Sequence, residues 1–458
     1  MKTDTLVREP SFYKRFFSVW SMLVLYNVIT LGVNLADNVM IGAYSETAMS
    51  GVSAVNQVQF VFQQLMMGLG DGIVVLGSQY WGKKQTEPIR RFLPGAFLVG
   101  AVLSLILFVA ACVAPEGILT IFTKNADIRA EGVEYLRIMK YSYLIFALTQ
   151  IFLAMLRSVE TVRIGFWVSL AALVSNISLN YLLIEGHLGC PALGVTGAAI
   201  ATTVARVMEL VVVVIYTLKV DRKLGWRIRD LFRPDGRLVR DFLKLVRPML
   251  FTSAMFGVAV ALQTAILGHM TDSAIAANSA ASTLYQTLKV ASVGAASAAS
   301  ILIGTAIGSG QMDKIKSYTR TLQLMFVGIG LCTSLLLFAL RYPILSLYDM
   351  TPETHKLAAD FILVLCFTGF GTAYEMPTII GLIRGGGDAK FVFWNDLISI
   401  WGIVIPLSLL AAFVFKWSPV AVICCLNADQ VFKCIPGCIK VNRYHWMKKL
   451  TREESTET

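Results

Sequence analysis

Long apolar stretches alternate with short polar connections along almost the whole chain. Many of these stretches reach 18 or more residues, the length at which a helix crosses a bilayer. Backbone groups in lipid must be satisfied within their own segment, so the pattern predicts helices, whereas a membrane β-barrel would alternate in short segments. Twelve spans are expected, at residues 16–43, 48–80, 92–115, 130–156, 163–185, 193–218, 242–268, 275–307, 317–341, 355–383, 390–415 and 417–440.

The charges agree with a membrane protein. Only 15% of the residues are charged, against about 25% in soluble domains. The net charge of +11 could indicate nucleic-acid binding, but the basic residues gather in alternate loops, for example at Lys83, Lys84 and Arg157. Cytoplasmic loops show this bias. We therefore expect a multi-pass protein of the inner (plasma) membrane, with both termini in the cytoplasm and no nucleic-acid partner.

The middle of the chain is its longest polar stretch. Lys219 to Arg247 contains ten basic and four acidic residues, and Arg233-Pro234-Asp235-Gly236 within it has the composition of a turn. This predicts a cytoplasmic linker at 223–241 that lies near lipid headgroups or in solvent. It would join an N-lobe, 1–222, to a C-lobe, 242–458, with six spans each.

The two halves repeat. Three landmarks recur at nearly constant spacing: Gly82 and Gly308 (308 − 82 = 226), Arg157 and Arg384 (384 − 157 = 227), and the Phe-Trp pairs at 166 and 393 (393 − 166 = 227). Constant spacing indicates an internal duplication. Because each half has an even number of spans, the repeats share one orientation in the membrane, as in transporters that place a substrate site between two lobes.

Five blocks in this order resemble the multidrug and toxic compound extrusion (MATE) transporters. They are Asn34–Val58, "GSQYWGKK" (Gly77–Lys84), "LRSVETVR" (Leu156–Arg163), "SNISLNYLLIEGHLGCPALGVTGAAIATTVAR" (Ser175–Arg206) and "RGGGDAK" (Arg384–Lys390). The resemblance covers essentially the whole chain. It implies two six-helix bundles related by pseudo-twofold symmetry. It also implies export of organic, usually cationic, compounds from a bacterial cell by antiport with Na⁺ or H⁺, through rocker-switch alternating access in a monomer.

One acidic residue lies deep in the first span. Asp37 is flanked by Val33 and Val39, and an ionisable group inside a membrane is a functional candidate by default. Its carboxylate could take a proton or hold a hard cation among oxygen ligands. Asn176 and Asn180 are four residues apart and so share a helix face.

In the DinF-like branch of the family, the positions that match Asp37, Asn176, Asn180 and Thr202 form an N-lobe cation site. The resemblance therefore predicts cation coupling, possible Na⁺ included, at these four residues; interhelical hydrogen bonding is the structural alternative. That branch often has an aspartate where this chain has Asn180. A bend of the first helix at a proline is in doubt, because Ser11 through Glu87 contains no proline.

The C-terminal half is a poorer candidate for ion coupling. The repeat partner of Asp37 is Gln263 (263 − 37 = 226), and that of Asn176 is Ile403 (403 − 176 = 227). In the NorM-like branch a glutamate stands eight residues after a proline of the seventh helix. Here the residue eight after Pro248 is Phe256, which favours the DinF-like arrangement.

Four residues are predicted to line a substrate cavity. Asp71 in the second span and Glu375 in the tenth span would attract a cation, and Tyr26 and Gln263 would contribute an aromatic wall and an amide. The structural alternative is ordinary hydrogen bonding and helix packing.

No cofactor and no catalysis are expected. The chain has no G-x-x-x-x-G-K-[ST] loop, and its eight cysteines and four histidines show no metal-ligand spacing. A membrane-embedded enzyme would need a cluster of His, Asp or Glu at an interface. A flippase for a lipid-linked precursor is the main alternative function. It would need a cationic cavity, whereas the charges recognised within the spans, Asp37, Asp71 and Glu375, are acidic.

Overall fold

The computed structural model describes residues 6–123, 125–346 and 350–452, and throughout these residues the regular structure is helical. Eleven helices are long and apolar enough to cross a membrane, and a twelfth span is formed if the bent pair α5 and α6 is counted as one. The prediction of an all-helical membrane protein is therefore confirmed. The extreme termini, whose cytoplasmic placement is predicted, lie outside the described residues.

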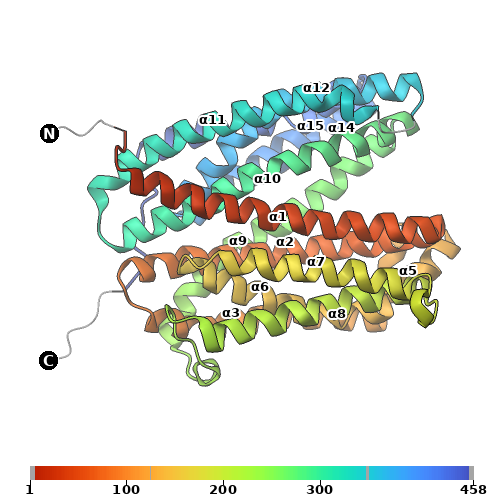
Figure 1. The fold of residues 1–458 in the computed structure, drawn as a ribbon. Coiled ribbons are helices and arrows are strands. Elements are labelled where there is room, and N and C mark those ends of the chain that lie inside the picture. The colour runs from red at the N-terminus through yellow and green to blue at the C-terminus, as the bar shows by residue number, and fades with distance from the viewer. Residues whose placement is uncertain (1–5, 124, 347–349, 453–458) are drawn as a thin grey trace, which may run out of the picture. The chain divides into compact units, whose positions relative to one another are not determined.

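The helices follow in chain order (Figure 1). The first half contains α1 (Pro10–Tyr44), α2 (Glu46–Gly82), α3 (Glu87–Val113), α4 (Pro115–Thr120), α5 (Ala126–Met139), α6 (Ser142–Ser158), α7 (Arg163–Leu183), η1 (His187–Gly189), α8 (Gly194–Ile215), η2 (Tyr216–Val220) and η3 (Ile228–Phe232). The second half contains α9 (Gly236–Gly268), α10 (Asp272–Gly308), α11 (Met312–Leu345), α12 (Pro352–Met376), η4 (Pro377–Arg384), α13 (Ala389–Asp396), η5 (Leu397–Val404), α14 (Ile405–Leu409), η6 (Leu410–Val414), α15 (Pro419–Leu426), α16 (Asp429–Phe432) and α17 (Cys434–Asn442).

The chain folds as two compact units. The C-terminal unit comprises Met1–Val24, Ser78–Lys84 and Arg247–Thr458, and the N-terminal unit comprises Leu25–Gly77 and Gln85–Val246. In the C-terminal unit α10, α11 and α12 pack side by side (Figure 1), and in the N-terminal unit α8 packs on α5, α6 and α7. The division into lobes 1–222 and 242–458, joined by a linker at 223–241, stays a prediction.

The predicted fourth span, 130–156, is broken in the structure. α5 and α6 meet at an angle of 55°. The Ser142 hydroxyl donates a hydrogen bond to the Met139 carbonyl at 2.7 Å, and a side chain that binds the backbone in this way competes with the helical ladder and bends it. Lys140 and Tyr141 connect the two helices at this bend. The Lys140 ammonium lies 5.8 Å from the ring centroid of Phe108 and 5.4 Å from that of Tyr141.

The polar stretch before α9 is ordered by side-chain capping. Asp235 Oδ1 accepts hydrogen bonds from the backbone N–H groups of Arg237 at 2.8 Å and Leu238 at 3.2 Å. An aspartate in this position satisfies the free N–H groups at a helix start. Trp226 is buried against the ring of Phe152, with centroids 5.3 Å apart. The stretch therefore packs within the N-terminal unit, and α9 begins at Gly236.

Two glycines allow α2 and α10 to approach within the C-terminal unit. An added Cβ on Gly308 would overlap the backbone carbonyl of Gln79, and one on Gly82 would overlap that of Thr305. These glycines are the first pair of repeat landmarks, and their physical role is close helix approach.

We expect Gly308→Ala to lower the melting temperature of the purified protein, because backbone must move to admit the methyl group. Overpacking of this kind costs about 1–3 kcal/mol. The matched control is Gly328→Ala in α11, where nothing lies within 4 Å of the added Cβ. Equal melting temperatures for the two variants would contradict the close approach.

The tail segment, residues 443–452, returns to the end of α2. Gln79 is fully buried; its Nε2 donates to the Lys448 carbonyl at 3.0 Å, and its Oε1 accepts from the Leu450 N–H at 2.8 Å. Lys448 N–H donates to the Gly386 carbonyl at 2.8 Å, and Trp446 is fully buried. The Gln79 side chain thus binds one backbone carbonyl and one backbone N–H of this segment and holds it against the end of α2.

Lys448 of this segment and Lys440 of α17 form an ion-pair group around Asp388, which lies between η4 and α13. Its carboxylate oxygens lie 2.9 Å from Lys440 Nζ and 2.7 Å from Lys448 Nζ. Burial raises the pKa of Asp388, but the hydrogen bonds and charges of Lys448 and Lys440 outweigh it and hold the pKa below the ordinary 3.8.

A depressed pKa in the folded state stabilises the protein above the unfolded pKa, which is about 3.9. That stabilisation is lost as the pH falls through the folded pKa. We therefore expect the acid-induced drop in melting temperature to be shallower in Asp388→Asn than in the parent, in melting curves taken from pH 7 down. Identical slopes would show that the pair does not stabilise the fold.

Candidate ion-coupling site

Four buried polar side chains meet in the N-terminal unit. Asp37 on α1 is 6% exposed, Asn176 and Asn180 on α7 are fully buried, and Thr202 on α8 is 7% exposed. α7 and α8 pack directly on each other. The structure therefore brings together all four residues that the sequence singled out, although their role stays a prediction.

The hydrogen bonds of this group form a closed chain. Asn180 Nδ2 donates to Asp37 Oδ1 at 2.5 Å and to Asn176 Oδ1 at 3.3 Å. Asn176 Nδ2 donates to Thr202 Oγ1 at 3.3 Å, and Thr202 Oγ1 donates to Asp37 Oδ2 at 3.5 Å. Both carboxylate oxygens thus receive a neutral donor, which is how a buried charge is made tolerable without a salt bridge.

The donor set suits a monovalent cation or a proton. Asp37 supplies one negative charge, and Asn176, Asn180 and Thr202 supply neutral oxygens, the ligands that hard cations prefer. Asn180 Oδ1 is buried and has no hydrogen-bond partner in the described structure. A buried acceptor left unpaired costs about 1–3 kcal/mol, and a cation beside Asp37 would relieve that cost.

Sequence reasoning missed an ion pair next to this group. Arg206 lies one turn beyond Thr202 on α8, and its Nη1 lies 3.1 Å from Glu209 Oε2. Its guanidinium also lies 4.7 Å from the ring centroid of Phe146. The sequence contained an indication of this pair, because an Arg and a Glu three residues apart in an apolar helix are expected to interact. Arg206 is thus paired with Glu209, and its positive charge lies close enough to act on Asp37.

The other predicted residues lie elsewhere. Tyr26 on α1 is eleven residues from Asp37, or about 16 Å along a helix axis, and its hydroxyl is 3.5 Å from Gln150 Nε2. Asp71 is half-buried on α2 and makes none of the four contacts around Asp37. In the C-terminal unit, Gln263 on α9 donates to the Leu426 carbonyl at 3.4 Å, and Glu375 is half-buried near the end of α12.

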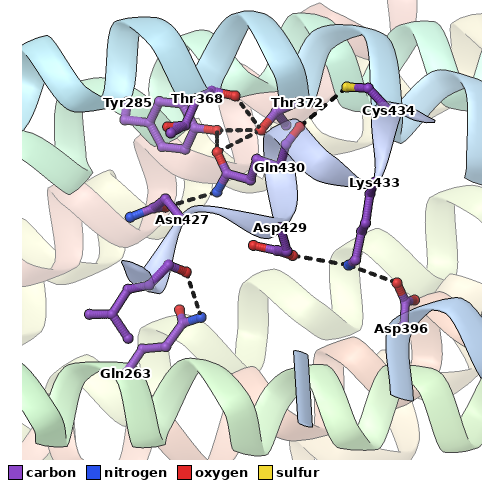
Figure 2. A network of polar contacts seen from close by, with 11 residues as sticks. Gln263, Tyr285, Thr368, Thr372, Asp396, Asn427, Asp429, Gln430, Lys433 and Cys434 are labelled. Carbon is purple, nitrogen blue, oxygen red and sulfur yellow. Dashed lines mark hydrogen bonds and ion pairs between the residues drawn. The ribbon is translucent and has the colours of Figure 1, made fainter. Parts of the chain in front are cut away.

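A second charged group lies in the C-terminal unit, and the sequence analysis did not find it. Lys433 Nζ lies 2.8 Å from Asp396 Oδ1 and 3.0 Å from Asp429 Oδ2 (Figure 2). The spacing of Asp429 and Lys433 at i,i+4 was the available signal. The sequence predicted one continuous apolar span at 417–440, so it did not indicate that this span is broken or that its charged residues form a group.

An uncharged network holds that break in place. Gln430 Oε1 accepts from Thr372 Oγ1 at 2.8 Å and from the Tyr285 hydroxyl at 3.1 Å (Figure 2). Gln430 Nε2 donates to Asn427 Oδ1 at 2.8 Å. α12, α10 and the α15–α16 connection are thereby tied together around one amide.

A sequence model of the MatE family matches residues 23–182 and 248–410. The chain belongs to the MatE family. It is accordingly a multi-pass membrane transporter and not an enzyme. The two matched stretches begin 225 residues apart (248 − 23), close to the spacing of the repeat landmarks.

Relatives extend over nearly all of this MatE chain. It is 24% identical over 416 residues to an uncharacterized transporter, YisQ, from Bacillus subtilis, covering 89% of each chain. It is 23% identical over 403 residues to a probable multidrug resistance protein NorM from Geobacillus kaustophilus, covering 86% of this chain and 87% of that one. A solved MOP superfamily transporter from Pyrococcus furiosus shares the fold, with a TM-score of 0.85, 15% identity, and coverage of 98% and 100%.

Proposed function

We propose that this transporter exports small organic compounds, mainly cations, by antiport with Na⁺ or H⁺ through rocker-switch alternating access. Family membership supports transport, and the relatives named as multidrug resistance proteins support drug-like cargo. The observation that carries the ion coupling is the buried Asp37 with its three neutral partners.

Asp37 would couple the two fluxes through its change of charge. With an ion or proton bound, the group is neutral or charge-balanced. Without one, a buried carboxylate relies on Asn180 and Thr202 for its hydrogen bonds. An ion can shift a conformational equilibrium only by its differential affinity for the two states. Rearrangement of these hydrogen bonds between the states would supply that difference.

The arrangement fits the DinF-like branch better than the NorM-like branch. Its carboxylate lies in the N-terminal unit, and Phe256 stands where the NorM-like pattern has a glutamate. We further propose a monomer in the bacterial plasma membrane, as the family resemblance implies. The distribution of basic loops supports a cytoplasmic location for both termini. Asp71, Gln263, Glu375 and Tyr26 remain the proposed cavity residues, with the two acids attracting a cationic substrate.

The test is flux of a fluorescent organic cation in proteoliposomes that contain the full chain, with a sodium gradient or a proton gradient imposed separately. We expect one gradient to drive uphill flux and an ionophore that collapses it to stop that flux. Flux at the rate of empty liposomes under both gradients would overturn the proposal. Lipid-linked precursors would then be tested as flippase substrates.

A further inference from the structure

Lys433 is the most deeply buried ammonium group of the charged cluster in the C-terminal unit. Its side chain is 5% exposed, and Asp396 and Asp429 bracket it at 2.8 and 3.0 Å (Figure 2). Removing an ammonium ion from water costs several kcal/mol, which only close carboxylates and further hydrogen bonds can offset. The three groups therefore form a single unit in which each depends on the others.

The Lys433 ammonium group is placed between the two carboxylates as a bound cation would be. Two carboxylates from different elements face one positive centre, and without that centre they would repel each other. The side chains of Asp396 and Asp429 are 21% and 14% exposed, several times more than that of Lys433. The two carboxylates are thus partly exposed, whereas the ammonium group between them is buried and covalently attached to the chain.

Irregular backbone surrounds the cluster on both sides. Asp396 ends α13 immediately before the π-helical η5, and Lys433 lies in the break between α16 and α17. Such interruptions in membrane helices gather at ion and substrate sites. Gln430 directly follows Asp429, and its partners hold the adjoining break between α15 and α16, which fixes the position of Asp429.

Two further charges lie near the cluster. Glu375 on α12 and Lys289 on α10 both interact electrostatically with it. The Lys289 ammonium lies 5.9 Å from the ring centroid of Tyr285 and 5.8 Å from that of Phe256. The cluster thus contains three acidic and two basic side chains, and Lys433 is the basic one that lies directly between two of the carboxylates.

We propose that Asp396 and Asp429 form a latent cation site which Lys433 fills as a tethered cation. When Lys433 is removed, the site takes a small monovalent cation or a primary alkylammonium ion. In the wild-type protein this unit takes up no free coupling ion, which leaves ion coupling to Asp37. That last consequence rests on the proposed function, whereas the latent site does not.

The test is chemical rescue of the purified full-length chain in an Asp37→Asn background, which removes the candidate N-terminal site. Lys433→Ala deletes the four side-chain atoms beyond Cβ, which correspond to propylammonium. Melting temperature is measured against propylammonium and Na⁺, with choline keeping ionic strength constant. We expect a saturable rise for Lys433→Ala, with half-saturation at a concentration at least about tenfold lower than any response of the parent.

Lys433→Met is the matched control, because it removes the same charge but fills the same space. It should not respond to propylammonium. Cooperative melting of Lys433→Ala with no response to either cation would overturn the proposal, as would an equal response of Lys433→Met. An absence of antiport in the wild-type protein would not change any of these melting curves, so the two proposals fail separately.

A second variant covers the case in which Lys433→Ala does not fold in any of these salts. Asp396→Asn combined with Lys433→Ala relieves the carboxylate repulsion and leaves Asp429 as the single charged ligand. We expect it to fold and to respond to propylammonium more weakly than a two-carboxylate site would. If it folds and shows no response, the latent site does not exist.

Discussion

Asp37→Asn is expected to abolish ion-driven export while the protein stays folded. The amide keeps the shape of the side chain and can remain hydrogen-bonded to Asn180 and Thr202, but it cannot take a proton or balance a cation. Removing the charged partner of a buried ion costs about 3 kcal/mol or more, which is on the order of 100-fold in binding. The measurement is gradient-driven flux of an organic cation in proteoliposomes, with melting temperature as the check on folding.

Asp127→Asn is the matched control for that change. Asp127 is an exposed residue in the first turn of α5, so the same substitution there should leave flux at the parental rate. Gradient-driven export by Asp37→Asn at the parental rate would remove Asp37 from the mechanism and leave its hydrogen bonds with a structural role alone.

Asn180→Leu is expected to weaken ion coupling strongly without removing it. The leucine deletes the 2.5 Å hydrogen bond to Asp37 Oδ1 and the unpaired oxygen that we assign to the cation. A hydrogen bond to a charged group contributes about 1.5–3 kcal/mol, so the ion concentration for half-maximal flux should rise about tenfold or more. Flux is measured across a series of Na⁺ concentrations and pH values.

Asn180→Asp is expected to lower the ion concentration for half-maximal flux, the opposite of the effect of Asn180→Leu. It restores the aspartate that DinF-like relatives often have and adds a second carboxylate next to Asp37, so cations should bind more tightly than in the parent. If the leucine and aspartate variants shift the half-maximal ion concentration in the same direction, Asn180 is not an ion ligand.

The sequence predicted the spans and the N-terminal site because both rest on local patterns. Apolar length alone places a membrane helix, and the four-residue spacing of Asn176 and Asn180 places both on one face. The spacing does not show that Asp37 and Thr202 meet them. That expectation came from the family resemblance, and the hydrogen bonds of the structure now give it a geometry.

What the sequence did not predict depends on contacts between distant segments or on broken helices. The bend between α5 and α6 is accompanied by a serine hydroxyl that binds the preceding turn, and no hydropathy pattern marks it. The pairing of Lys433 with Asp396 joins residues from two different spans, and hydropathy does not distinguish a paired lysine from an unpaired one. The contact of Gln79 with the tail segment is beyond any local pattern, because the two lie 369 residues apart.

That last contact has a consequence for how the protein is made. α2 is synthesised early, yet its end at Gln79 acquires its hydrogen-bond partners only when Lys448 and Leu450 have left the ribosome. Until then a buried amide, and the backbone around it, must remain hydrated or be held by another factor. A nascent chain stalled after α17 would contain every span and still lack this closure, so quality control could distinguish it from the finished protein at one end of α2.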